Sequence, residues 1–160
     1  MVRPRSSGGT QPSEFPVEAT FEEQAKFLLR YAILAPSSHN TQPWEFLIED
    51  RAIHLYRDLS RWLRVADADR RELHLSLGCV LENLLIAARY FGFEPIVRRD
   101  DGSESDRVAS VELESGTNEP SGQNNRLFRA IPDRRTNHHP FRKKPLSRKE
   151  VNVLESVATE

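Results

Sequence analysis

The sequence predicts an α+β fold in which a mostly antiparallel sheet packs against one long, buried helix. Apolar residues recur at helical spacing through residues 69–91, over more of the circumference than a surface helix needs. Two pairs of short segments, within residues 44–57 and 94–113, each flank a turn and indicate two pairs of strands. The apolar residues are concentrated between Phe21 and Val97, so the middle of the chain supplies most of the core.

Composition limits the class of protein. The chain has 160 residues, of which 38% are hydrophobic and 29% charged, and this is enough for one compact domain. Its formal net charge is −1, so no overall field attracts it to nucleic acid or to an anionic membrane. No run approaches the roughly 18–20 apolar residues of a membrane-spanning helix, and residues 1–13 lack the apolar stretch of a secretory signal. We therefore expect a soluble, cytoplasmic protein.

The chain has a single cysteine, Cys79, which lies in an apolar run. One cysteine excludes an intrachain disulfide and a cysteine-rich zinc site, and it is typical of a reducing compartment. We interpret Cys79 as a small, buried hydrophobic side chain.

The first helix follows a flexible N-terminal segment, residues 1–16, which is rich in Ser, Gly and Pro. Thr20 and Glu23 have the spacing of a capping box, in which the hydroxyl and the carboxylate satisfy N–H groups of the first turn. Pro36 ends this helix because proline disfavours helical geometry in the residue before it.

Two strands, at residues 44–49 and 53–57, come next, and Asp50-Arg51 between them indicates a tight hairpin. The long helix then runs to Gly92, a natural C-terminal cap. If one face of this helix were exposed in a monomer, it would form a large apolar patch, so we expect self-association. Its main apolar stripe consists of Leu73, Leu77, Leu81, Leu84, Ala88 and Phe91.

A second strand pair is predicted at residues 94–98 and 108–113, around a charged turn. A polar loop at residues 115–125 separates it from a short helix at residues 126–132. Further on, Ser147 and Glu150 form a second capping box. The amphipathic helix after it has no partner later in the sequence, so we expect an incomplete folding unit.

The loop at residues 35–44 places hydroxyls, amides and one imidazole between a helix end and a strand. Such a loop offers donors and acceptors to a planar heteroaromatic ligand with ring nitrogens and carbonyls. Pro36 and Pro43 make it rigid, as a preorganised site requires. The alternative is a helix-stop loop whose Ser and Asn side chains bond their own backbone, and the sequence leaves both open.

Residues 133–144 hold five basic residues and two histidines. Adjacent arginines next to a hydroxyl suit a phosphate monoester, because the guanidinium fork matches its oxygens. A solvated basic connector is an equal alternative. A nucleic-acid surface is a weaker one, because Phe141 alone offers a ring for stacking.

Three histidines, His39, His138 and His139, do not predict a metal site. Adjacent histidines in an extended segment point to opposite sides, and no carboxylate or cysteine lies at ligand spacing. No nucleophile elbow, Walker loop or glycine-rich dinucleotide motif is present, and we identify no catalytic acid or base. Three acidic residues are interpreted as charges that favour a helix N-terminus: Asp67, Asp69 and Glu72.

Two segments resemble the nitroreductase-like family of FMN-binding oxidoreductases. The string APSSHNTQPW at residues 35–44 resembles the loop after the first core helix of these flavoproteins. The string LGCVLENLLIAAR at residues 77–89, with GFEP after it, resembles their long interface helix and the next strand. The resemblance covers residues 21–97, and its loop motif is the more specific part.

The family's arginine motif, which holds the FMN phosphate just before the first helix, has no counterpart at residues 11–20. The string RRTNHHPF at residues 134–141 resembles it instead. This arrangement resembles the two-repeat, Acg-type branch of the family, in which two fused units imitate a homodimer. On this interpretation, residues 17–125 form the first repeat. Residues 126–160 are the linker and the opening helix of a second, truncated repeat.

The resemblance implies that FMN binds at a subunit or repeat contact, and that it carries hydride from NAD(P)H to nitroaromatic or quinone-like acceptors. The protein would supply position and hydrogen bonds. One alternative is a non-catalytic or truncated relative that binds or sequesters FMN, and another is an interaction module whose basic segment binds an acidic partner. The implied flavin contacts are Pro36, Ser37, Ser38 and Asn40, and the implied phosphate contacts are Arg134, Arg135, Thr136 and His138.

Overall fold

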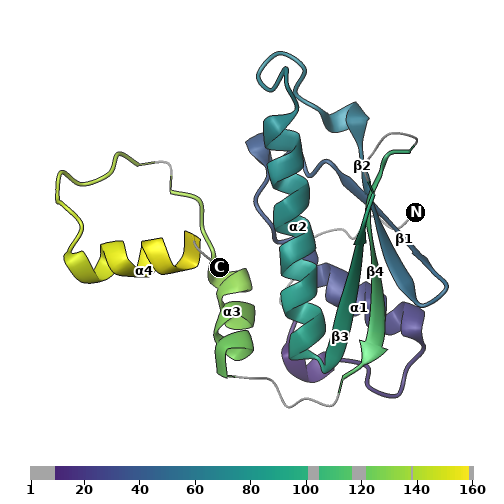
Figure 1. Cartoon of the computed structure of the whole chain (residues 1–160). Helices are drawn as coiled ribbons and strands as arrows, with labels where there is room; N and C mark the ends of the chain where they lie inside the picture. The colour runs from purple at the N-terminus through teal and green to yellow at the C-terminus, as the bar shows by residue number, and fades with distance from the viewer. Residues whose placement is uncertain (1–9, 101–104, 117–121, 138, 159–160) are drawn as a thin grey trace.

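The computed structural model describes residues 10–100, 105–116, 122–137 and 139–158. Four strands form one sheet in the order β1-β2-β4-β3, and every neighbouring pair is antiparallel (Figure 1). The predicted α+β class and antiparallel sheet are confirmed. The strands are β1 (Trp44–Glu49), β2 (Ala52–Arg57), β3 (Phe93–Arg99) and β4 (Arg107–Ser115). The α-helices are α1 (Phe21–Ala32), α2 (Arg71–Tyr90), α3 (Gly122–Asp133) and α4 (Arg148–Ala158).

Both predicted strand pairs are present. Asp50 and Arg51 join β1 to β2 with positive φ values of 48° and 61°, the backbone sign that a type I′ hairpin turn requires. Along the sheet, buried side chains alternate with exposed or half-buried ones, as in a sheet with one covered face. The covered face carries Trp44, Phe46, Ile53, Leu55, Val111 and Leu113.

The opposite face of the sheet carries polar side chains. His54 Nδ1 lies 2.8 Å from Ser110 Oγ across the β2–β4 pair. Arg98 on β3 forms an ion pair with Glu112 on β4, with 2.7 Å between Nε and Oε1. These cross-strand pairs fix the register of a face that water can reach.

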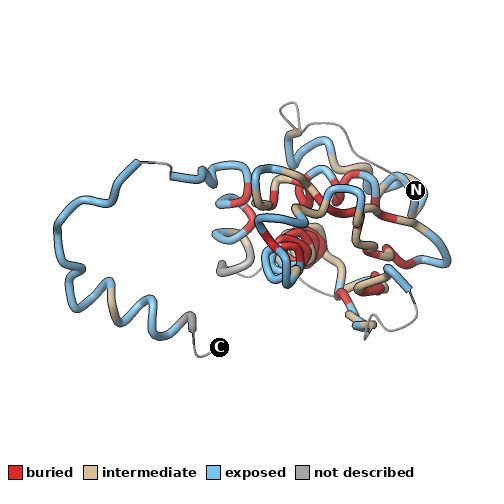
Figure 2. Tube along the Cα trace, turned by 90° about the horizontal axis from the view of Figure 1, so that it is seen from above, coloured by how far each residue is buried: buried red, intermediate tan, exposed pale blue. Residues whose placement is uncertain are grey.

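Helix α2 lies at the centre of the molecule, and α1, α3 and β3 all pack on it. Figure 2 shows its buried residues gathered in the middle of the trace. Most of the predicted stripe is buried, whereas Leu81 and Phe91 are half-buried and Leu75 is 58% exposed. Because neighbouring elements of the same chain cover most of its apolar surface, the large free patch that motivated the prediction of self-association is absent from the described residues.

Part of the segment predicted to be flexible is packed against the core. Pro12–Glu14 form a 3₁₀ turn, and the ring of Phe15 stacks on Phe91 with centroids 4.4 Å apart. Phe27 meets Phe15 edge-on at 5.5 Å. Ser, Gly and Pro dominate the composition of residues 1–16, so the sequence did not indicate the contact that Phe15 makes. Residues 1–9 lie outside the described part of the chain.

Helix α3 is longer than the sequence predicted. It begins at Gly122, inside the segment that was predicted to be a polar loop. The sequence did not indicate this start because the residues of the first turn are polar and show no helical periodicity. Phe128 anchors it: the ring is 2% exposed and stacks on Tyr90 of α2 with centroids 3.7 Å apart. Ile131, one turn later, is also buried.

Helix α4 begins, as predicted, after the Ser147–Glu150 capping box, in which Glu150 N lies 3.3 Å from Ser147 Oγ. It lies apart from the sheet and from α2 in Figure 1. Figure 2 shows the segment that leads to it as almost entirely exposed. The exposed apolar side chains of this region are Phe141, Leu146, Val153 and Leu154.

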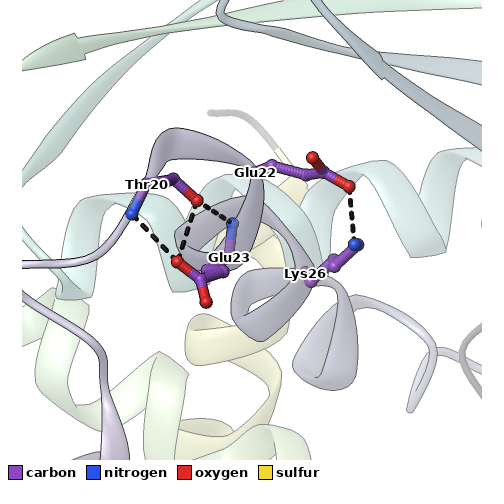
Figure 3. A network of polar contacts seen from close by, with 4 residues as sticks. All are labelled: Thr20, Glu22, Glu23 and Lys26. Carbon is purple, nitrogen blue, oxygen red and sulfur yellow. Dashed lines mark hydrogen bonds and ion pairs between the residues drawn. The ribbon is translucent and has the colours of Figure 1, made fainter.

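Helix α1 begins with the predicted capping box (Figure 3). Glu23 N donates to Thr20 Oγ1 at 3.3 Å, and Thr20 N donates to Glu23 Oε2 at 3.1 Å. The hydroxyl of Thr20 also donates to Glu23, and these bonds lower the pKa of Glu23 below its ordinary 4.5. One turn on, Lys26 and Glu22 form an exposed ion pair at 2.6 Å.

Thr20→Ala should lower the free energy of unfolding by about 1 kcal/mol, because the first turn loses its cap. Since the pKa of Glu23 is lowered in the folded state, the wild-type contribution is present above pH 4.5 and is lost as the pH falls through the lowered value. Urea denaturation at pH 7 and pH 3 measures both effects. Lys26→Ala is the control, with an expected loss of at most about 0.5 kcal/mol. Equal losses in the two variants would contradict the capping role.

Candidate functional site

The loop between α1 and β1 has an unusual backbone. His39, Asn40 and Gln42 have φ values of 50°, 55° and 50°, and none of them is glycine. A non-glycine residue in the left-handed region is uncommon, although Asn and His tolerate it better than most. Three such residues within four positions require support from the surrounding structure.

Hydrogen bonds inside and outside the loop supply that support. Ser37 Oγ accepts from Gln42 N at 2.9 Å, so for Ser37 the interpretation as a loop that bonds its own backbone is confirmed. From outside, Arg61 Nη1 donates to Thr41 O at 2.8 Å. Asn83 on α2 reaches the carbonyl oxygen of Tyr31 at the end of α1 at 3.4 Å, which ties the start of the loop to the central helix.

The N-terminus of α2 lies beside this loop and is capped by Asp67. The side chain of Asp67 is 4% exposed, and its two oxygens accept from Glu72 N and Leu73 N, each at 2.9 Å. Burial raises the pKa of Asp67, but the two backbone donors, a hydrogen bond with Asp69 and the charge of His74 together hold it below its ordinary 3.8. Asp67 was predicted to favour the helix dipole, and the structure shows the more specific role of a cap.

Residues of the loop, of α2 and of the basic segment together line an open hollow of about 400 Å³, within the range of small-molecule sites. Pro36, Ser37 and Ser38 form its loop side, and Thr136 lies on it from the segment after α3. Four of its lining residues come from one face of α2: Glu72, Leu75, Ser76 and Cys79.

The arginines after α3 have different environments. Arg134 Nη1 donates to Thr136 Oγ1 at 3.0 Å, and its Nη2 lies 3.5 Å from Leu34 O. Arg134 thus contacts a residue that lines the hollow, but it lines a separate open hollow on α3 itself. Arg135 Nη1 donates to the carbonyl oxygens of Pro132 and Arg134 at 2.7 and 2.8 Å. Arg135 thus binds carbonyls at the C-terminal end of α3 and is not one of the residues that line the hollow.

Of the predicted contacts, the structure brings together Pro36, Ser37, Ser38 and Thr136 on one hollow, and Arg134 bonds to Thr136 from outside it. Asn40 is exposed and is not among the lining residues, and His138 lies outside the described residues. Glu72 and Leu75 were not predicted as site residues. Cys79 was predicted to be buried, whereas it is half-buried and lines the hollow.

A signal for the missed residues exists in the sequence. Positions 72, 75, 76 and 79 share one face of a helix by their spacing of three and four. The apolar stripe on the other faces of α2 is the stronger pattern in the sequence, whereas this face combines a carboxylate, a hydroxyl and a thiol. Within the described ranges, no three His, Cys, Asp or Glu side chains lie together as metal ligands would. None of the helices in the described part of the chain is both long and apolar enough to span a bilayer.

The chain is similar to three proteins of Mycobacterium tuberculosis. It is 32% identical over 120 residues to "Putative NAD(P)H nitroreductase Rv3131", an alignment that covers 74% of this chain and 34% of that protein. It is 32% identical over 121 residues to "Putative NAD(P)H nitroreductase acg", covering 75% and 36%. With "Uncharacterized protein Rv3127" the identity is 33% over 123 residues, covering 71% and 36%. The chain therefore spans about a third of the length of these relatives.

Other comparisons add little. A crystal structure of a "Putative NADH Oxidase" from Clostridium acetobutylicum is 21% identical, covers 57% of this chain and 74% of that one, and has a TM-score of 0.47. No family model matches the chain. The named relatives support the resemblance to nitroreductase-like NAD(P)H oxidoreductases that the loop and helix motifs indicate.

Phe128→Ala should lower the free energy of unfolding by about 3–5 kcal/mol, because a buried ring that holds α3 on α2 is lost. Amides of α3 should then exchange with solvent faster than those of β4, since α3 is released first. Denaturant titration and hydrogen exchange measure the two effects. Leu127→Ala, at a side chain that is 44% exposed, is the control and should cost less than about 1 kcal/mol. A loss for Phe128→Ala no larger than this would contradict the anchoring role.

Asp67→Ala should destabilise the start of α2 and with it the hollow, because two buried N–H groups lose their acceptors. The pKa of Asp67 is lowered in the folded state, so the wild type should gain more stability than the variant as the pH rises through that value and above 3.8. Unfolding curves between pH 2 and pH 6 compare the two proteins. Parallel pH profiles would show that Asp67 contributes nothing specific.

Proposed function

We propose that this chain is part of an FMN-dependent, nitroreductase-like oxidoreductase, and that the hollow beside α2 is its flavin site. One observation carries the proposal. Ser37 and Ser38 lie on the same hollow as Thr136, about a hundred positions further along the chain, and Arg134 bonds to Thr136. These two segments were singled out by the same family resemblance, for a flavin and for its phosphate.

The residues of the hollow fit a flavin in chemical type. Pro36 and Leu75 offer apolar surface to a planar ring. The bond from Gln42 N to Ser37 uses an acceptor site of the hydroxyl and not its O–H, which can therefore donate to a ring carbonyl or nitrogen. Arg134 supplies a charged fork for the phosphate, and its bond to Thr136 places a hydroxyl beside that fork.

The described residues contribute position rather than proton transfer. FMN, when bound, would supply the hydride-transfer chemistry between NAD(P)H and a nitroaromatic or quinone-like acceptor. The supported loop presents its hydroxyls in one conformation, which lowers the entropic cost of binding. The open side of the hollow leaves room for the donor and the acceptor to approach.

We further propose that the complete site includes a second unit of the same kind. This follows from the two-repeat interpretation, in which residues 17–125 are the first repeat and residues 126–160 open the second. The apolar side chains exposed on and before α4 are consistent with it, since such a helix face is normally covered. The partner is a second repeat or a second copy of the chain, and the protein acts in the cytoplasm.

An FMN-binding protein without turnover is the second candidate. The observation that favours it is the state of the phosphate-binding segment. Arg135 is committed to backbone carbonyls, and Arg134 is exposed and only partly placed at the hollow. On this alternative the chain holds or sequesters FMN and passes no electrons to an acceptor.

The purified chain should retain a flavin absorption band through gel filtration after incubation with FMN. Arg134→Ala should weaken binding about tenfold or more, because a charge-assisted hydrogen bond contributes about 1.5–3 kcal/mol. Arg142→Ala removes the same charge from the same segment away from the hollow and should leave the affinity within about twofold. Equal effects of the two substitutions, or no retained flavin, would contradict the proposed site.

NADPH oxidation separates the two candidates. Flavin-loaded protein that oxidises NADPH faster than the same concentration of free FMN supports the oxidoreductase. Protein that binds FMN tightly without this gain supports the sequestering alternative.

A further inference from the structure

Glu72 is the charged side chain that α2 contributes to the hollow. It lies in the first turn of the helix and lines the hollow together with Ser37, Ser38 and Leu75. The hydroxyl of Ser38 donates to its Oε2. This carboxylate lines the hollow in which the proposed flavin would bind.

The contacts of Glu72 connect it to the strained loop. Besides the bond from the Ser38 hydroxyl, Ser38 N lies 3.4 Å from Ser76 Oγ, and Ser76 Oγ donates to the backbone oxygen of Glu72 at 2.7 Å. Ser76 is 4% exposed, so this link is shielded from water. Ser38 is thus held at both its backbone and its side chain by one turn of α2, directly before the three positions with positive φ.

Glu72 is an exposed residue at the open side of the hollow. In the described parts of the chain, no ion pair involves Glu72, whereas Glu22, Asp100 and Glu112 each have a partner within 2.7 Å. Arg134 bonds to Thr136 and to Leu34 O instead. The hollow therefore has a carboxylate on its α2 side, and a guanidinium contacts its opposite side through Thr136.

We infer that Glu72 is a positioning residue with two separable effects on the site. Its carboxylate accepts from Ser38 and so fixes the loop, and its negative charge disfavours the gain of electrons by a ligand that rests against it. This inference depends on the proposed flavin site. Because like charges repel, the same carboxylate also favours binding with the phosphate at the Arg134 end and the uncharged ring at the α2 end.

Two substitutions separate the hydrogen bond from the charge. Glu72→Gln removes the charge but keeps an amide oxygen that can accept from Ser38. Ser38→Ala removes the donor and leaves the charge. Glu82→Gln is the matched control, since Glu82 is exposed on the same helix ten residues further on, which is about 15 Å along the axis.

The measurement is the midpoint potential of FMN bound to the full chain, with the dissociation constant of oxidised FMN determined beside it. Glu72→Gln should strengthen binding of reduced relative to oxidised FMN about tenfold, which raises a two-electron potential by about 30 mV. Glu82→Gln should leave both quantities unchanged. Ser38→Ala should weaken binding of oxidised FMN by about fivefold and shift the potential less than Glu72→Gln does.

Each outcome bears on one proposal. A potential that Glu72→Gln shifts no more than Glu82→Gln would overturn the inference about charge and leave the flavin site standing. Normal binding by Ser38→Ala would overturn the positioning role. Wild-type protein that binds no FMN would overturn the proposed function and, with it, this inference. Circular dichroism of each variant shows that a lost signal is not lost folding.

Discussion

The burial of α2 is the constraint on which the rest of the structure depends. Nine of its residues are buried. The positions of α1, α3 and β3 are determined by their packing on this helix. These elements leave one face of α2 uncovered, and this face carries Glu72, Leu75 and Cys79. The hollow lies where no neighbouring element covers the central helix, so the packing of the core determines the location of the candidate site.

The loop before β1 shows how that core supports a strained backbone. The positive φ values at His39, Asn40 and Gln42 each cost free energy that local sequence does not recover. Hydrogen bonds of the loop backbone with Arg61 and Ser76 outside the loop, and with Ser37 within it, offset this cost. Since Ser76 belongs to α2 and Asp67 caps the turn in which Glu72 lies, the conformation of the loop depends on the helix start as well as on its own prolines.

The sequence predicted those elements whose signals are local, and it failed where the cause is tertiary. The capping boxes, the Asp50-Arg51 turn and the length of α2 depend on neighbours in the chain and were predicted to within a few residues. The first turn of α3 is polar and shows no helical periodicity, and the packing of Phe15 depends on Phe91, which is far away in sequence. For the site, motif resemblance placed Ser37 and Ser38, but only the fold shows that α2 turns a carboxylate toward them.

The two ends of the hollow differ in what they require from the rest of the protein. On the α2 side every polar group is held by a partner within the core unit, as with Ser38 between Glu72 and Ser76. On the other side Arg134 is anchored by one bond to Thr136 and a long contact to Leu34, on a segment whose side chains are exposed. An exposed arginine binds phosphate weakly, because water and salt ions compete for its guanidinium group. A second unit that covers this segment would remove that competition, and this is a physical reason to place the complete site at a contact between units.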